Sequence, residues 1–139
     1  KALNWKFAHK ESPKFKKLVC THNNTLLGYI IFIVRETNNR KIATIYDFLC
    51  SPTQKVVFSS LMKGAIIEIE KSNPDSIEIL CSDSRFQNQL KKLAFLSTRE
   101  NNYALKYMND EQIKNAAPLK NGNNWFFTYG DGDKVFWEI

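Results

Sequence analysis

The stretch that decides the fold is residues 42–81, IATIYDFLCSPTQKVVFSSLMKGAIIEIEKSNPDSIEILC. Residues 42–50 are apolar almost throughout, with Asp47 as the one charge, which is typical of a buried strand. Residues 54–71 then repeat apolar side chains at helical spacing: Val57, Leu61, Ala65 and Ile69. Residues 77–81 form a short apolar strand. The sequence therefore predicts two parallel strands joined by a right-handed helical crossover.

Outside this unit, two Asn-rich turns at residues 22–25 and 37–40 separate β-rich runs and predict an antiparallel meander that leads into the crossover. A short helix is expected before Pro13. The other elements expected are strands at 18–21, 26–35, 103–108 and 125–129, and an amphipathic helix at 86–95. The fold class is therefore α/β (α+β), with a mixed, largely antiparallel sheet, a β-α-β crossover and helices on both faces.

Composition and charge suit one globular domain with a basic leading segment. The chain has 139 residues, 43% of them hydrophobic, and a net charge of +6, which excludes a disordered or collagenous chain. Residues 1–17 carry six Lys and one Glu, so +5 of the charge lies there. That segment is either a solvated helix face or a contact for an acidic or phosphate-rich partner. Lysines alternate with aromatic residues in it, but no nucleic-acid-binding motif is present, so nucleic acid is not expected.

Membrane and metal binding are not expected either. The longest uncharged apolar run, residues 26–34, is too short to span a bilayer, and no secretory signal is visible. Cys20, Cys50 and Cys81 form no Cys-x-x-Cys pair, so we expect reduced thiols, no metal site and a cytoplasmic protein.

The order of elements, β-β-β-α-β-α-β-β, resembles the GNAT superfamily of acyl-CoA-dependent N-acyltransferases from its second strand onward. Residues 125–133, WFFTYGDGD, are similar to the closing strand of GNAT-like domains of polysaccharide biosynthesis. The resemblance implies that residues 18–139 are the carboxyl-terminal part of a GNAT-like acyltransferase domain. It implies that residues 1–17 are the tail of a preceding portion.

The resemblance also implies where acetyl-CoA or another acyl-CoA binds. In the family the two parallel strands splay apart around the pantetheine arm, and the helix that follows offers its amino end to the pyrophosphate through a Gln/Arg-x-x-Gly-x-Gly/Ala loop. Residues 54–59, QKVVFS, match at Gln54, whereas Val57 and Ser59 stand in place of small residues. The implied cofactor-binding residues are Phe48, Leu49, Cys50, Gln54, Lys55, Val56, Val57, Phe58 and Ser59.

A plainer interpretation of the same residues remains open. They also suit an ordinary helix start, capped by Ser51 or Thr53, in which Val56, Val57 and Phe58 pack inward.

Two catalytic roles follow from the resemblance. The family pattern Leu-Tyr-x-x-x-Gly-Phe falls on residues 89–95, where Leu90 replaces the acidic Tyr and Ala94 the Gly. Tyr103 or Tyr107 could substitute for it in space, and Tyr103 is the candidate general acid. Asp47 is the candidate general base; alternatively, it faces solvent or bonds a neighbouring backbone amide.

Acetyl transfer to a small-molecule or sugar amine is the implied activity. A degenerate GNAT-like module that binds a partner without chemistry is the alternative. A homodimer, or contacts to an amino-terminal domain, would complete either form.

Overall fold

The structure is a computed structural model that describes residues 15–97 and Thr128. The elements expected before Pro13 and at 103–108 lie outside these residues. So does the strand expected at 125–129, apart from Thr128 itself, which is not part of a strand. The described residues fall into two compact units, one holding 15–80 and Thr128 and the other holding 81–97.

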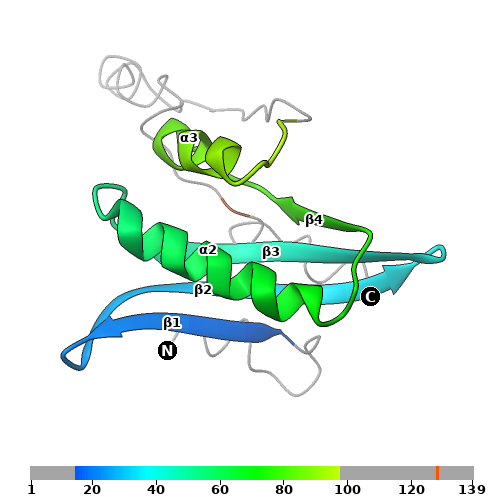
Figure 1. Cartoon of the computed structure of the whole chain (residues 1–139), viewed down its shortest axis with the longest axis horizontal. Coiled ribbons are helices and arrows are strands. Elements are labelled where there is room, and N and C mark those ends of the chain that lie inside the picture. The colour runs from blue at the N-terminus through cyan, green and yellow to red at the C-terminus, as the bar shows by residue number, and fades with distance from the viewer. Residues whose placement is uncertain (1–14, 98–127, 129–139) are drawn as a thin grey trace, which may run out of the picture. The chain divides into compact units, whose positions relative to one another are not determined.

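The first unit is a mixed sheet with one helix (Figure 1). Strands β1 (Lys16–His22), β2 (Thr25–Thr37), β3 (Arg40–Cys50) and β4 (Ser76–Ile79) lie in chain order across the sheet, with helix α2 (Lys55–Glu70) between the last two. The first three strands pair antiparallel, and β3 pairs parallel with β4. The predicted meander, crossover and mixed sheet are therefore confirmed.

Both hairpins turn on two asparagines. Asn23 and Asn24 have φ of 47° and 61°, and Asn38 and Asn39 have φ of 52° and 60°. Two-residue hairpin loops of type I′ require positive φ at both central positions, and Asn tolerates that conformation better than most residues. The Asn-rich turns in the sequence thus correspond to two tight hairpins.

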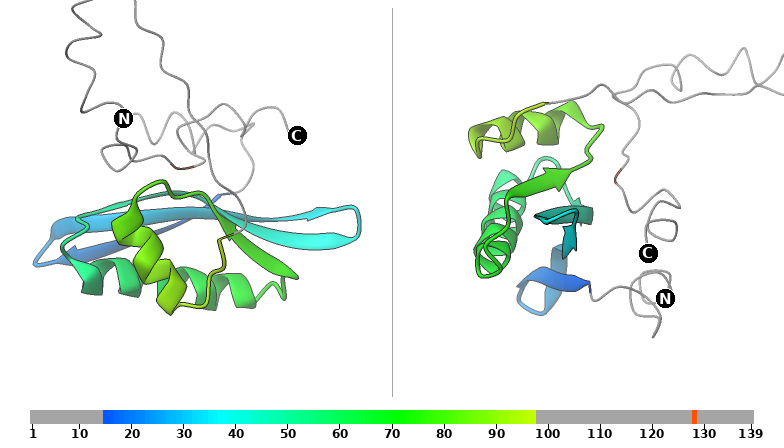
Figure 2. Two further views of the ribbon diagram at one scale, coloured as in Figure 1. Left: turned by 90° about the horizontal axis from the view of Figure 1, so that it is seen from above. Right: turned by 90° about the vertical axis from the view of Figure 1, so that its right-hand side faces the viewer.

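One face of the sheet, the α2 face, is covered by α2, as the edge-on view of Figure 2 shows. Phe48 on β3 packs against Phe58 on α2, with ring centroids 5.4 Å apart. Burial of apolar side chains between helix and sheet supplies the main stabilisation of this layer. The fully buried side chains of the core include Ile30, Phe32, Ile45, Phe48, Phe58, Met62 and Ile69.

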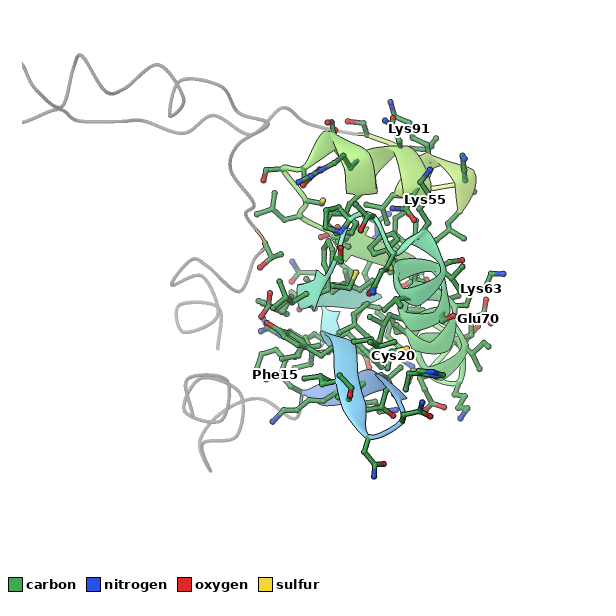
Figure 3. All side chains as sticks on the ribbon, turned by 90° about the vertical axis from the view of Figure 1, so that its left-hand side faces the viewer. Phe15, Cys20, Lys55, Lys63, Glu70 and Lys91 are labelled. Carbon is green, nitrogen blue, oxygen red and sulfur yellow. The ribbon has the colours of Figure 1, made fainter. Side chains whose placement is uncertain are left out.

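The opposite face of the sheet, the second face, has its own apolar cluster. Ile31, Ile33 and Tyr46 are buried there. Phe15 meets the Tyr46 ring edge-on, with centroids 5.2 Å apart, and the Arg35 guanidinium lies 5.3 Å from the centroid of that ring. Figure 3 shows Phe15 on the side of the sheet away from α2. The described residues of this unit place one helix on the sheet, so a helix on the second face stays a prediction.

The second unit contains helix α3 (Ser84–Lys92). Asp83 is its N-cap and accepts a 2.8 Å hydrogen bond from the Arg85 backbone N–H. The Arg85 guanidinium also donates to both carboxylate oxygens of Asp83 and lowers the pKa of that carboxyl. The helix was predicted to continue to residue 95 and ends earlier.

A Schellman motif ends α3. Ala94 has φ of 64°, its N–H donates to the Lys91 carbonyl, and the Phe95 N–H donates to the Leu90 carbonyl, both at 3.1 Å. This is the pairing expected when a residue with left-handed backbone follows the C-cap, a position where Gly is preferred. The Gly of the family pattern falls on Ala94, which adopts this conformation with a methyl group.

Candidate functional site

The parallel pairing of β3 with β4 covers only part of β3. It runs from Ile42 opposite Ser76 to Ile45 opposite Ile79 and stops there, whereas β3 continues to Cys50. Figure 1 shows β4 diverging from β3 in this direction. Among residues 15–97 and 128, no strand pairs with residues 46–50 on the side away from β2. We call this side of residues 46–50 the open edge.

A β-bulge lies where the open edge begins. Asp47 pairs with Ile31 and Ile45 pairs with Phe32, so Tyr46 is an extra residue with no partner on β2. Bulges disrupt the local hydrogen-bond ladder and increase the twist of a strand. The bulge at Tyr46 therefore coincides with the point at which β3 and β4 separate.

The open edge offers backbone groups rather than core side chains. Phe48 and Cys50 are 1% and 7% exposed, so their side chains belong to the core. Leu49, at 54% exposure, is accessible. Where a strand runs beyond its neighbour, its backbone N–H and C=O groups can pair with an extended ligand. Of the residues expected to bind the cofactor, Leu49 and Cys50 on β3 can therefore contribute backbone groups.

Helix α2 begins just beyond this edge. Its N-cap is Gln54, whose side chain makes no capping hydrogen bond. The prediction that Ser51 or Thr53 caps the helix was wrong, because their hydroxyls hydrogen bond to each other at 2.8 Å. The Val57 N–H donates to the Gln54 carbonyl at 3.0 Å. By helix geometry the N–H groups at the first two positions have no acceptor within the helix.

The side chains of the first turn of α2 divide between core and solvent. Val57 and Phe58 are 8% and 1% exposed and pack inward, as the plainer interpretation of this loop expected. Val56 does not, because it is 78% exposed. Lys55 is also exposed (Figure 3) and Ser59 is half-buried. The amino end of α2 therefore presents to solvent one ammonium group and free backbone donors.

Asp47 lies half-buried on the second face and is held by two hydroxyls. The Tyr29 hydroxyl donates to Oδ2 at 2.9 Å, and the Thr128 hydroxyl donates to Oδ1 at 3.0 Å. Two partners of the carboxylate are thus hydroxyl groups from distant parts of the chain. Two hydrogen bonds to one carboxylate fix its orientation.

Sequence reasoning found Asp47 and missed its two partners. Tyr29 carries a polar tip within an otherwise apolar run, which is the only local signal for it. Thr128 belongs to the closing motif at residues 125–133, singled out above for another reason. The other proposed catalytic residue, Tyr103, lies outside the described residues.

The cysteines in the core are protonated thiols. Burial, with a smaller effect of the nearby Cys20, raises the pKa of Cys50 to about 11. Burial likewise raises the pKa of Cys81 to about 11, although its Sγ donates to the Asp83 carbonyl at 3.7 Å. Since the thiolate is the nucleophilic form, neither side chain is suited to covalent catalysis at neutral pH. All three are free, and within the described residues no three potential metal ligands come together.

Solved structures of acetyltransferases share this fold. A probable acetyltransferase superimposes with a TM-score of 0.54 and 14% identity, over 69% of each chain. The aminoglycoside acetyltransferase meta-AAC0020, from an uncultured soil metagenomic sample, superimposes with a TM-score of 0.51 in two crystal structures. The complex with trehalose has 12% identity over 78% of this chain and 84% of that one. The complex with sisomicin has 14% identity over 76% and 71%.

The resemblance to the GNAT acetyltransferase fold is therefore confirmed. No protein-family model matches the chain, and no curated protein sequence matches it significantly. The identities are low, so these comparisons establish the fold. Within the part of the chain that the structure describes, no helix has the length and apolar character needed to cross a bilayer.

Proposed function

We propose that this chain is an acyl-CoA-dependent N-acyltransferase, or the carboxyl-terminal part of one, that transfers an acetyl group from acetyl-CoA to an amine. One observation carries the proposal: the open edge of β3 starts at the Tyr46 bulge and leads to the amino end of α2. Backbone amides at a strand edge and a helix amino end are the two features that suit an extended pantetheine amide and a pyrophosphate.

In this proposal the cofactor is held mainly by backbone. The pantetheine arm runs along the open edge and pairs with backbone groups of Leu49 or Cys50, whichever point away from β2. The pyrophosphate accepts hydrogen bonds from the first N–H groups of α2, with the Gln54 amide and the Lys55 ammonium beside it. The buried Val57 and Phe58 and the half-buried Ser59 fix the position of this turn.

Asp47 takes the proton from the acceptor. The acceptor amine reaches the thioester as an ammonium ion at neutral pH and must lose a proton before it attacks. Asp47 accepts that proton, directly or through one water, while Tyr29 and Thr128 hold its carboxylate. The nitrogen then forms a bond to the thioester carbon as the carbon–sulfur bond breaks. The CoA thiolate that leaves is protonated, a role that we propose for Tyr103.

Small-molecule and sugar amines are the acceptors that we propose. The aminoglycoside acetyltransferase of the same fold has been crystallised with sisomicin and with trehalose, which supports an acceptor of this size. We do not propose that this chain shares the substrate of that enzyme.

Calorimetric titration with acetyl-CoA tests the cofactor site. Lys55→Ala should weaken binding by about three- to tenfold, because it removes one charge-assisted contact to phosphate. Lys63→Ala is the matched control, since Lys63 is also exposed on α2 but lies two turns further along (Figure 3). Absence of binding at millimolar acetyl-CoA would refute the proposal.

A transfer assay tests the chemistry. Asp47→Asn should leave acetyl-CoA binding unchanged and lower the rate of acetyl transfer by about 10²–10⁴-fold, the usual contribution of a general base. Equal rates for the variant and the parent chain would remove Asp47 from the mechanism.

A non-catalytic GNAT-like binding module is the second candidate. It is favoured by Leu90, which is buried on α3 and cannot donate a proton where the family has Tyr. Acetyl-CoA binding without release of CoA in the presence of any amine would support this candidate.

A further inference from the structure

An exposed apolar row crosses the sheet beside Asp47. Val19 on β1 pairs with Tyr29 on β2, and Tyr29 pairs with Leu49 on β3. Directly paired residues have side chains on the same face, about 5 Å apart at Cβ. Val19 and Leu49 are 63% and 54% exposed, and Tyr29 is half-buried. We call these three side chains the apolar row.

The row and the Asp47 carboxylate share the second face. The Tyr29 hydroxyl bonds to Asp47, so the middle of the row points toward that carboxylate. Leu49 lies two residues beyond Asp47 on the same strand, about 7 Å further along. A single small ligand can therefore touch both an apolar surface and an anion.

The charges on this face disfavour a polycation. By strand register, the charged side chains that share this face within residues 15–97 are three cations and two carboxylates: Lys17, Arg35, Arg40, Asp47 and Glu78. A ligand with several ammonium groups would meet more cations than anions there, and like charges oppose binding. One ammonium group, placed at Asp47, is what the face accommodates.

We propose that the acceptor is a primary amine with one ammonium group and an apolar or aromatic substituent about two carbons away. The ammonium pairs with Asp47, and the substituent lies on Val19, Tyr29 and Leu49. This inference rests on the proposed function, which assigns Asp47 to the acceptor amine. The proposed acceptor differs from a polycationic aminoglycoside such as sisomicin, which is bound to the acetyltransferase of similar fold.

Methyl-resolved NMR of the full chain tests the surface without requiring catalysis. The probe is 2-phenylethylamine, with ethylamine, 2-phenylethanol and spermidine as comparisons. Only 2-phenylethylamine should shift the Val19 and Leu49 methyl resonances at low millimolar concentration. Leu49→Ser should weaken its binding about fivefold, because half of a leucine side chain is lost as contact, and Asp47→Asn about tenfold or more.

Ile67→Ser is the matched control. Ile67 is 58% exposed on α2 and lies outside the row, so its replacement should leave the affinity for 2-phenylethylamine unchanged. Absence of methyl shifts, tighter binding of spermidine, or equal effects of the Leu49 and Ile67 substitutions would each overturn the inference.

A transfer assay with the same amines separates this inference from the proposed function. If 2-phenylethylamine binds through the row and no amine releases CoA, the amine site stands and the acyltransferase proposal fails. If CoA is released faster with spermidine than with 2-phenylethylamine, the acyltransferase proposal stands and the acceptor class proposed above is wrong.

Discussion

Replacing Gly28 with Ala should destabilise the first unit severely. A Cβ at Gly28 would lie 2.6 Å from the Leu49 carbonyl oxygen and 2.8 Å from the Cys50 Cβ. Both atoms are fixed to the β3 backbone, so neither can move without separating paired strands. Overpacking of a core commonly costs about 1–3 kcal/mol, and rigid backbone contacts place this site at about 3 kcal/mol. At about 3–5 °C per kcal/mol for a chain of this size, the melting temperature should fall by about 10 °C.

Gly64→Ala is the matched substitution on α2. The added Cβ would lie 3.4 Å from one Leu18 methyl carbon, an ordinary contact, and Ala is favoured over Gly in a helix interior by about 0.8–1 kcal/mol. This variant should be more stable than the parent chain. Denaturant unfolding with circular dichroism measures both. A loss of less than about 1 kcal/mol in Gly28→Ala, or a comparable loss in Gly64→Ala, would refute the reasoning.

Three further substitutions address a thiol and the two ends of α3. In the folded chain the Cys50 thiol keeps its proton up to about pH 11, whereas the thiol of an unfolded chain loses its proton near pH 8.5. The buried, protonated thiol therefore contributes its full stability below pH 8.5, and this contribution is lost as the pH rises from about 8.5 to about 11. Thermal unfolding between pH 8 and 11 should show a smaller fall in melting temperature for Cys50→Ala, and an identical fall would contradict this. Ala94→Gly relieves a methyl at φ of 64° and should slow amide exchange in α3 about fivefold, a gain of about 1 kcal/mol; faster exchange would count against the Schellman assignment. Asp83→Ala removes the N-cap and should destabilise α3 by about 1 kcal/mol, which amide exchange in α3 also measures. Unchanged exchange rates would contradict a stabilising role for this cap.

The sequence predicted the elements of the first unit because their signals are local. Hydrophobic periodicity marked residues 42–81, and paired asparagines marked both hairpins. Helix ends were less accessible. The end of α3 depends on Ala94 adopting a backbone conformation that its side chain disfavours. The start of α2 depends on a hydrogen bond between Ser51 and Thr53 that removes both from capping.

The candidate site was only half accessible from the sequence. Asp47 was recognisable as a lone charge in an apolar strand. Its partners Tyr29 and Thr128 lie 18 and 81 residues away in the chain, so only the folded chain brings them together. The bulge at Tyr46 could not be predicted, because no glycine or proline lies near it in the sequence of β3.

That bulge also sets the phase of β3. Ala43 and Ile45 face α2, so the regular alternation of a strand would also place Asp47 in the hydrophobic core under α2, where a carboxylate without a partner is costly. The extra residue Tyr46 shifts this alternation by one position, so that Asp47 lies on the second face and Phe48 lies in the core under α2. Straightening the bulge with Tyr46 kept in the ladder would therefore turn Asp47 toward α2 and Phe48 toward the second face, whereas deleting Tyr46 would leave both side chains on their present faces.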